Sequence, residues 1–557
     1  MHCNESLIMI IFNYSNKRIK CEDNMDKVIS FIKRINTNKE SENSISFHSF
    51  IKYCENNILL IFLTFLIIIV SHGYLLFNSN VGIDTEIFLN NPQNNYNWLD
   101  IGRFGLIVEK YILNLGFFNM FYAEALAIVF LLLFNIICFY TFYTISGKNN
   151  KLLFIIFPLV GLTSPIWAEQ FIFYIQIAQI SFALVLTILS VLFTYKWILE
   201  RNWFSCLMGI LLLVLSIGTY QSLVPIYIAF SIFCLLLLFE NKEYSEKKSI
   251  FYIIVQVISL FAISFVMYEI ILKITKVDFS YLNGSNFWNI SSSKKEVIFS
   301  IINHIKEILL ARTQFYNYGF LFASIVFVIC GIVNSIHNEK ITTKVYKVLY
   351  FLCYLAFLST PFLMTIYLGQ GSVVRAEIYL PLVEAMIIMF AVENMFKIFK
   401  SDLLRFLILV PVIYIVFVQS FYLESLYYTD HLTREKDKEY IYQLAHDLKE
   451  AGVPDTATLF IYGHFNGMET PATTKGQVIG TSMFEFNHTI YPMYYYSGQT
   501  VVYLFRAYGF NYNWLPIEKI DQARDKVSSE EYPCWPKEGY ITKSEEDDYY
   551  TIKINMY

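Results

Sequence analysis

Long apolar runs separated by short polar stretches fill the chain between residues 57 and 424. A helix that crosses the hydrocarbon core of a bilayer needs about 20 mostly apolar residues and must pair its own backbone polar groups. About eleven stretches meet this requirement. They occupy residues 57–77, 120–143, 151–166, 171–195, 204–218, 219–239, 250–272, 317–336, 346–367, 376–395 and 404–424. The pattern therefore predicts an α-helical polytopic membrane protein with about 11 transmembrane helices.

The loops between these stretches differ in their content of lysine and arginine, which concentrate in cytoplasmic loops of membrane proteins. Both are frequent in residues 1–56, so this segment is expected to be cytoplasmic. Alternate loops also contain them, at residues 148–151, 196–201, 242–248, 340–347 and 397–405. Residues 273–316 depart from the rule, because this opposite-side connection has six cations. The lysine and arginine content of most loops thus predicts a cytoplasmic N-terminus. Because the number of predicted helices is odd, the C-terminus is expected to be extracytoplasmic.

The last part of the chain is more polar and predicts a small α/β domain. Its first segment has apolar residues on one helical face, namely Ile441, Leu444, Ala445 and Leu448. A strand is expected at residues 456–462 and a hairpin within residues 541–555. The predicted organisation is a cytoplasmic segment (1–56), a multi-span membrane domain (57–424) and an extracytoplasmic domain (425–557).

Composition agrees with a lipid environment and excludes some classes of function. The 557 residues are 56% hydrophobic and 16% charged, whereas a soluble protein has about 25% charged residues. The net charge is −4 without a long basic tract, so no nucleic acid is expected as a partner. Nine cysteines and nine histidines are scattered without the spacing of a metal site. We therefore expect no metal and no cofactor.

The first long external loop, VGIDTEIFLNNPQNNYNWLDIGRFG, carries the densest group of charges next to a predicted helix. It contains Asp84, Glu86, Asp100 and Arg103. One carboxylate in an exposed loop is usually only solvated. Charge held against a membrane is costly, however, so four such residues around one Gly-Arg-Phe-Gly turn favour a functional site.

Other polar residues are predicted at the same membrane face. They are Glu169 in SPIWAEQF, Tyr220 and Gln221 in GTYQSLVP, and Gln370, Arg375 and Glu377 in LGQGSVVRAEIYLP. Arg375 also suits a second interpretation, in which an arginine near a helix end only extends its guanidinium to the interface. We expect Asp100, Tyr220, Gln221, Gln370 and Glu377 to contact substrate.

The location constrains the chemistry. No pool of nucleotide sugars exists outside the cell, the cytoplasmic loops are too short for a nucleotide-binding domain, and no P-loop is present. An outward-facing transferase would therefore use a sugar carried on a lipid phosphate. Asp84, with Glu86 and Glu169, could take the proton of an acceptor hydroxyl. Arg375 or Arg103 could bind the departing phosphate, which suits a bidentate guanidinium.

The segments GIDTE, LDIGRFG, SPIWAEQF and GTYQSLVP resemble those of the bacterial Gtr type II glucosyltransferases, which include serotype-converting enzymes. The resemblance covers residues 60–430. It implies a GT-C-like membrane fold and transfer of glucose from undecaprenyl phosphate to a cell-surface glycan, with membrane lipid around the protein. By this resemblance, Asp84 and Glu86 match the acidic loop motif and Arg103 matches the Gly-Arg turn.

Two other classes of function fit a polytopic protein of this kind. A flippase or transporter of lipid-linked sugars would also hold charge within the membrane, but it would not need a carboxylate cluster in the first outer loop. A lipid-linked glycan polymerase or ligase would differ from a glycosyltransferase in the donor that it consumes. Both remain alternatives at the level of the sequence.

Overall fold

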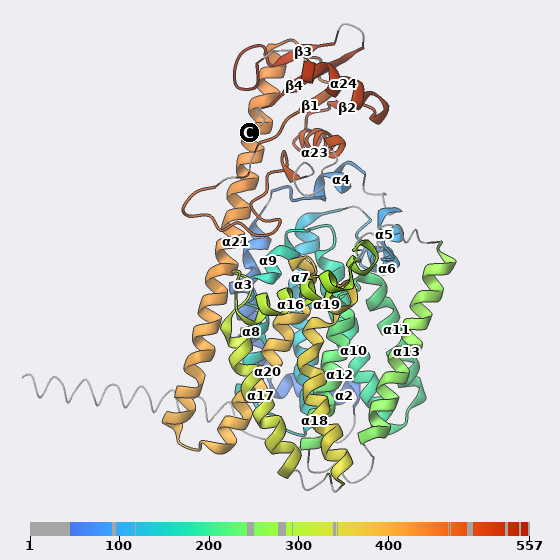
Figure 1. Ribbon diagram of the computed structural model, residues 1–557, viewed down its shortest axis with the longest axis vertical. Helices are drawn as coiled ribbons and strands as arrows, with labels where there is room; N and C mark the ends of the chain where they lie inside the picture. Colours follow the sequence, from blue (N-terminus) through green and yellow to red (C-terminus); the bar gives the residue numbers. More distant parts are fainter. Residues whose placement is uncertain are drawn as a thin grey trace, which may run out of the picture.

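The computed structural model describes residues 45–554, with gaps at residues 79, 92–95, 117, 242–249, 277–285, 292, 338–340, 342, 466, 468, 487–493, 530–532 and 545–546. Most of the predicted N-terminal segment (1–56) and residues 545–546 of the expected hairpin lie outside the described residues. The described chain is mostly helical, and its long helices run side by side in one bundle (Figure 1).

The bundle contains α2 (Phe47–Asn56), α3 (Ile58–His72), α7 (Met120–Ser146), α8 (Lys151–Gly161), α10 (Ile177–Glu200), α11 (Trp203–Thr219), α12 (Leu223–Glu240), α13 (Ile250–Ile274), α17 (Tyr318–His337), α18 (Lys344–Ser359), α20 (Tyr379–Ile398) and α21 (Asp402–Glu450). Within the described ranges, nine helices are long and apolar enough to cross a membrane. Two shorter apolar helices, α8 and α11, lie in the two shortest predicted stretches. The chain is thus a helical protein with several helices of membrane-spanning length.

Local sequence explains several helix ends. The Asn119 side chain accepts the backbone N–H of Tyr122 at the start of α7, as an N-cap residue does. Gly147 ends the same helix with a φ of 69°, a conformation that glycine adopts without steric cost. Pro158, which cannot donate a backbone hydrogen bond, lies in the last turn of α8 before Gly161. This proline is consistent with the shortness of α8.

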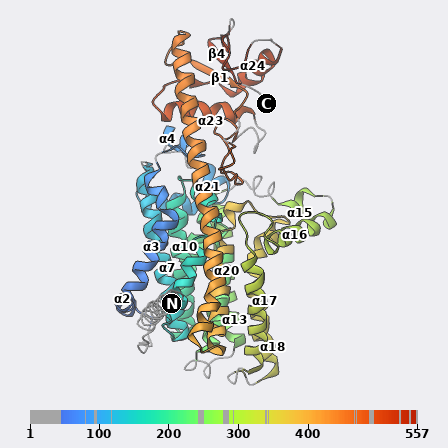
Figure 2. The ribbon, with the colours of Figure 1, turned by 90° about the vertical axis from the view of Figure 1, so that its left-hand side faces the viewer.

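Short elements gather at one end of the bundle, which we call the site end (the upper end of the bundle in Figure 1, below the C-terminal part). They are η1 (Gly73–Phe77), α4 (Thr85–Asn90), α5 (Tyr96–Asp100), α6 (Phe104–Ile112), α9 (Ile166–Phe171), α15 (Phe287–Ile290), α16 (Lys294–Leu309), η2 (Thr360–Phe362), α19 (Leu363–Leu368) and η3 (Val374–Ala376). In both ribbon views α2 lies at the opposite end (Figures 1 and 2).

The longest helix, α21, joins the bundle to the C-terminal part of the chain. Its 49 residues extend about 74 Å at 1.5 Å per residue, whereas a bilayer core is about 30 Å thick. The helix therefore continues well beyond the site end (Figure 2). The predicted boundary at residue 425 falls inside this continuous helix, so bundle and C-terminal part are connected by rigid secondary structure.

The C-terminal part forms a four-stranded sheet beside the far end of α21. Its elements are β1 (Thr458–Tyr462), α23 (Tyr494–Ala507), β2 (Asn513–Trp514), α24 (Ile517–Ser529), β3 (Ile541–Lys543) and β4 (Tyr549–Lys553), with strand order β2-β1-β4-β3. Strand β1 is parallel to β2 and β4, whereas β3 and β4 are antiparallel. Figure 1 shows α23 between this sheet and α4 of the site end. The C-terminal part therefore lies directly against the site end of the bundle.

A buried charge network fixes residues 481–483 on α21. The Arg434 side chain, 1% exposed, donates to Asp437 at 2.7 Å and to Asp430 at 3.4 Å. Arg434 also donates to the carbonyl of Thr481, and the backbone N–H of Met483 donates to Asp437 at 2.9 Å. Each buried charge is thus compensated by its neighbours, as burial requires.

We expect the substitution Arg434→Leu to lower the free energy of unfolding by about 3–5 kcal/mol, because it leaves two buried carboxylates without their cation. Denaturant or thermal unfolding of the purified protein measures the change. The matched control is Arg524→Leu, since Arg524 pairs with carboxylates at the surface of α24, where such pairs contribute about 0–1 kcal/mol. Equal destabilisation by the two substitutions would contradict the assigned role of Arg434.

Candidate functional site

Two loops press together at the site end and bring the acidic motif to the bundle. A Cβ atom on Gly82 would lie 2.6 Å from the Tyr174 ring and 2.9 Å from the Ile172 carbonyl oxygen, so only glycine permits this approach. Phe173 lies between Ile172 and Tyr174, and its ring centre is 4.6 Å from the guanidinium of Arg375. The GIDTE loop, the chain after α9 and the turn η3 therefore meet at one place.

Asp84 is the N-cap residue of α4 and has a left-handed backbone, with φ of 63° and ψ of −12°. Such a conformation costs on the order of 1 kcal/mol or more in a residue other than glycine, and it often marks functional sites. Among the described side chains, none forms a hydrogen bond or a close ion pair with the half-buried Asp84 carboxylate. Burial raises its pKa, and the positive charge of Arg375 opposes the rise.

Arg375 lies in η3, where the hydroxyl of Tyr220 donates to its carbonyl oxygen at 3.4 Å. Its side chain is half-buried, and its guanidinium stacks on the ring of Phe173. Among the described residues, the guanidinium has no hydrogen-bond or salt-bridge partner. Its positive charge acts on both Asp84 and Glu169. The structure thus brings Asp84, Glu169 and Arg375 together from three distant parts of the sequence.

Glu169 is fully buried in α9, and its carboxylate faces backbone N–H groups of the C-terminal part. Gln477 donates to Oε1 at 2.6 Å, Val478 donates to Oε1 at 3.2 Å and to Oε2 at 3.1 Å, and Ile479 donates to Oε1 at 3.4 Å. Burial raises the pKa of Glu169 to about 7, although these backbone donors and Arg375 oppose the rise. Both carboxylate oxygens are therefore engaged, unlike those of Asp84.

The Gly-Arg-Phe-Gly turn supplies a second cation. Gly102 has a φ of 74°, and a Cβ atom on Gly105 would lie 2.4 Å from the Thr219 hydroxyl oxygen. Glycine is thus required at position 102 by the backbone conformation and at position 105 by the close approach of α11. Arg103 between them lies 4.7 Å from the centre of the Tyr220 ring, and its Nη1 donates to Gln176 at 3.5 Å. Tyr220 contacts both arginines.

The remaining predicted site residues lie around this centre. Gln221 donates to the Ile101 carbonyl at 3.1 Å and to the Tyr268 hydroxyl at 3.2 Å, which ties the Arg103 turn to α13. Gln370 is half-buried, and Asp100 is exposed at the end of α5.

Glu86 faces the C-terminal part instead of the loop centre. It is 2% exposed, and its carboxylate is hydrogen-bonded to Thr500 of α23. Burial raises the pKa of Glu86 well above its usual range, and the neighbouring charge of Asp84 raises it further. Asn90, one turn along α4, donates to the Tyr503 carbonyl at 3.0 Å. Helix α4 is thus hydrogen-bonded to α23 through Glu86 and Asn90.

Glu377 belongs to a closed polar cluster. Its carboxylate accepts from Tyr316 at 2.8 Å and from Ser372 at 3.1 Å, and His304 Nε2 lies 3.0 Å from Oε1. Both oxygens are therefore occupied by protein groups. The sequence did not indicate His304 or Tyr316, because a lone histidine or tyrosine has no recognisable spacing.

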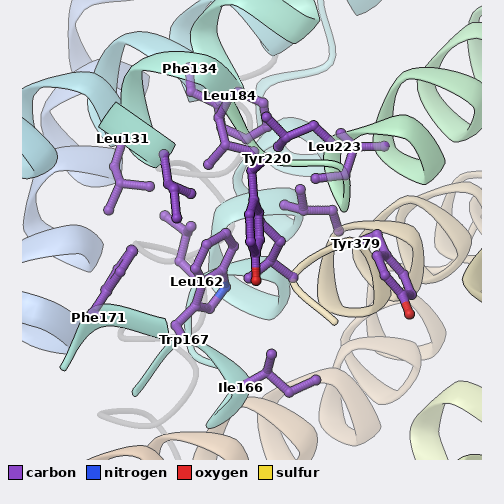
Figure 3. Close-up of a cluster of buried hydrophobic side chains, with 14 of the residues drawn as sticks. Leu131, Phe134, Leu162, Ile166, Trp167, Phe171, Leu184, Tyr220, Leu223 and Tyr379 are labelled. Atoms are coloured by element: carbon purple, nitrogen blue, oxygen red, sulfur yellow. The ribbon is translucent and has the colours of Figure 1, made fainter. Parts of the chain in front are cut away.

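The floor of the site is apolar. Figure 3 shows Tyr220, Trp167 and Tyr379 among packed aliphatic and aromatic side chains. Trp167 is fully buried, and its indole N–H donates to the Gly161 carbonyl at 2.6 Å. Such a floor excludes water, which strengthens electrostatic interactions above it.

Two components of the site were not indicated by the sequence. Phe173 stacks on Arg375, and the segment TKGQVIG at residues 474–480, which we call the strap, surrounds the Glu169 carboxylate. The two glycines of the strap are its only sequence signal. One group of described side chains, His446, Asp447 and Glu450, is spaced to hold a metal ion, but it lies on the α21 surface beside the C-terminal sheet.

The arrangement combines an unengaged carboxylate with a guanidinium over an apolar floor. Such a pair can accept a proton at Asp84 and bind an anion at Arg375. Comparison with protein families gives a match to the family described as Glucosyl transferase GtrII, over residues 73–392. A comparison with curated proteins finds no match. The matched range includes Asp84, Glu169 and Arg375 and ends before the strap.

The raised pKa of Glu169 predicts a pH-dependent contribution to stability. The unfolded carboxyl loses its proton near its usual pKa of 4.5, whereas the folded one keeps it until about pH 7. The contribution of Glu169 is therefore fully present below pH 4.5 and is lost as the pH rises through 7. The loss is on the order of 3 kcal/mol.

Glu169→Gln removes this titration. Thermal unfolding of both proteins at pH 4.5 and pH 7.5 is expected to show that the variant gains stability relative to the natural protein as the pH rises. A stability difference that is the same at both pH values would show that Glu169 titrates normally.

Proposed function

Because the chain belongs to the glucosyl transferase GtrII family, we propose that it transfers glucose from a polyprenyl-phosphate donor to a cell-surface glycan. The family identifies the chain as a glycosyltransferase. The lipid-linked donor, the glycan acceptor and the position of the site end on the outer face of the membrane are our proposal. The low content of lysine and arginine in most loops at the site end supports this orientation.

One observation supports the lipid-linked donor above all. A groove of about 1140 Å³ lies between α17, α20 and α21. Its lining residues on α21 begin at Leu404 and end at Tyr422, a span of about 27 Å at the helical rise. This length approaches the thickness of the hydrocarbon core. The groove can therefore hold an isoprenoid chain along most of the bilayer.

The groove opens toward the polar residues of the site end. Arg312, Gln314 and Thr474 line it there, and Tyr316 and Asn317 also line a smaller cavity beside Ile166 of α9. Gln314 donates to the carbonyl of Lys475 in the strap at 2.7 Å. A chain in the groove would thus carry its phosphate to the neighbourhood of Glu169 and Arg375.

The proposed reaction uses two residues directly. An acceptor hydroxyl forms a bond to the anomeric carbon of the sugar and gives its proton to the Asp84 carboxylate. The bond between that carbon and the phosphate oxygen breaks, and its electron pair remains on the phosphate. Arg375 offsets the charge that develops there. The apolar floor strengthens this interaction by excluding water.

We expect Asp84→Asn to lower the rate of transfer from polyprenyl-phosphate glucose by about 10²–10⁴-fold, because this is the typical contribution of a general base. Asparagine tolerates the left-handed conformation, so the loop should keep its shape. The assay supplies purified protein with the donor and candidate cell-surface glycans. Asp455→Asn, at an exposed position, is the matched control; retained transfer in Asp84→Asn would remove Asp84 from the mechanism.

Filling the groove should affect long donors more than short ones. Ala323→Trp places a large ring in the groove, and we expect it to reduce transfer from a long-chain polyprenyl donor by about tenfold or more. A donor with a chain of two isoprene units should be affected much less, since it does not reach the filled part. Ala356→Trp, on the exposed face of α18, is the control. An equal loss with both donors would argue against chain binding in the groove.

A further inference from the structure

The strap is a short tight turn whose backbone surrounds one carboxylate. The N–H of Gly476 donates to the Ile479 carbonyl at 2.9 Å and closes the turn. The next three N–H groups, of Gln477, Val478 and Ile479, converge on Glu169 at 2.6–3.4 Å. Successive N–H groups of this kind form an anion-binding concavity. Here the anion is a side chain of the membrane part.

The fit between strap and Glu169 leaves no spare space. A Cβ atom on Gly476 would lie 1.9 Å from Glu169 Oε1, so no other residue fits there without displacing the carboxylate. The φ of Gly476 lies outside the left-handed region. Glycine is therefore needed at position 476 for contact with Glu169 and not for the path of the backbone.

The strap also holds the turn that carries Arg375. The backbone N–H of Val374, the first residue of η3, donates to the side-chain oxygen of Gln477 at 2.8 Å. Gln477 thus joins Glu169 through its backbone and η3 through its side chain. Arg375, the next residue along η3, is stacked on Phe173.

Both ends of the strap are fixed to α21. The N–H of Thr474 donates to the Thr429 hydroxyl at 2.8 Å, and Thr481, directly after the strap, accepts from the buried Arg434. The strap is therefore a bridge between the helix that supports the C-terminal part and the loops that form the site.

We infer that the strap positions Arg375 and that Glu169 acts through the strap as a positioning residue, so that the C-terminal part completes the site. The structural part of this inference is independent of the reaction. Its catalytic consequence rests on the proposed function, in which Arg375 receives the phosphate.

Hydrogen–deuterium exchange of the full-length protein tests the structural part without any substrate. In Glu169→Ala, we expect the amides of residues 477–479 to exchange about tenfold faster or more, because they lose a charged acceptor. The amide of Val374 should become faster as well, although it does not contact Glu169. Unchanged exchange at Val374 would overturn the inference, since η3 would then be ordered without the strap.

Two further variants separate this contact from general destabilisation. Glu469→Ala, which removes an exposed carboxylate that pairs with Lys475, should leave exchange in residues 372–378 unchanged. Gly476→Ala should reproduce the effect of Glu169→Ala, and the double variant should be no worse than either single one, because both act on the same contact. Additive effects would show that they act separately and would overturn the assignment.

The transfer assay then tests the consequence. Glu169→Ala and Gly476→Ala should each lower kcat by about 10-fold to 100-fold, as a misplaced catalytic group does, with a smaller change in KM for the acceptor. Normal kcat in variants with fast exchange at Val374 would overturn the positioning role. If the natural protein itself transfers no sugar from a polyprenyl phosphate, the proposed function fails, whereas the exchange data still decide the role of the strap.

Discussion

The burial of one carboxylate inside a turn of backbone N–H groups is the interaction on which the site depends. Glu169 lies in the helical bundle. The backbone N–H groups that donate to its carboxylate lie more than 300 residues later, at Gln477 to Ile479. A buried charge is tolerated only when hydrogen bonds compensate its lost hydration. Because the strap supplies that compensation, the C-terminal part contributes directly to the structure of the site.

The geometry of α21 makes this contact possible. A helix about 74 Å long carries the chain across the bundle and beyond it, and the buried pairs of Arg434 fix residues 481–483 against its side. The strap is thereby held at a defined height above α9. A flexible linker at this point would make the contact with Glu169 depend on chance encounters and would raise its entropic cost.

The distribution of charge across the site follows from the same constraint. Carboxylates that meet protein donors, such as Glu169 and Glu377, are enclosed and have no free oxygen. Asp84 differs, because its strained backbone presents an unengaged carboxylate beside Arg375. Of the acidic residues considered, it is the one whose surroundings suit proton transfer to and from a bound molecule.

The sequence by itself determined the apolar helices, their approximate ends and the family. These features are local, since about 20 apolar residues in a row and a few glycines in fixed positions are readable without a partner. It also indicated Asp84, Arg103, Glu169 and Arg375, because charges beside a membrane are costly wherever they point. Only the tertiary structure decided which of them are engaged. The partner of Glu169 is a set of backbone N–H groups, which every residue except proline has, so no sequence pattern could reveal it.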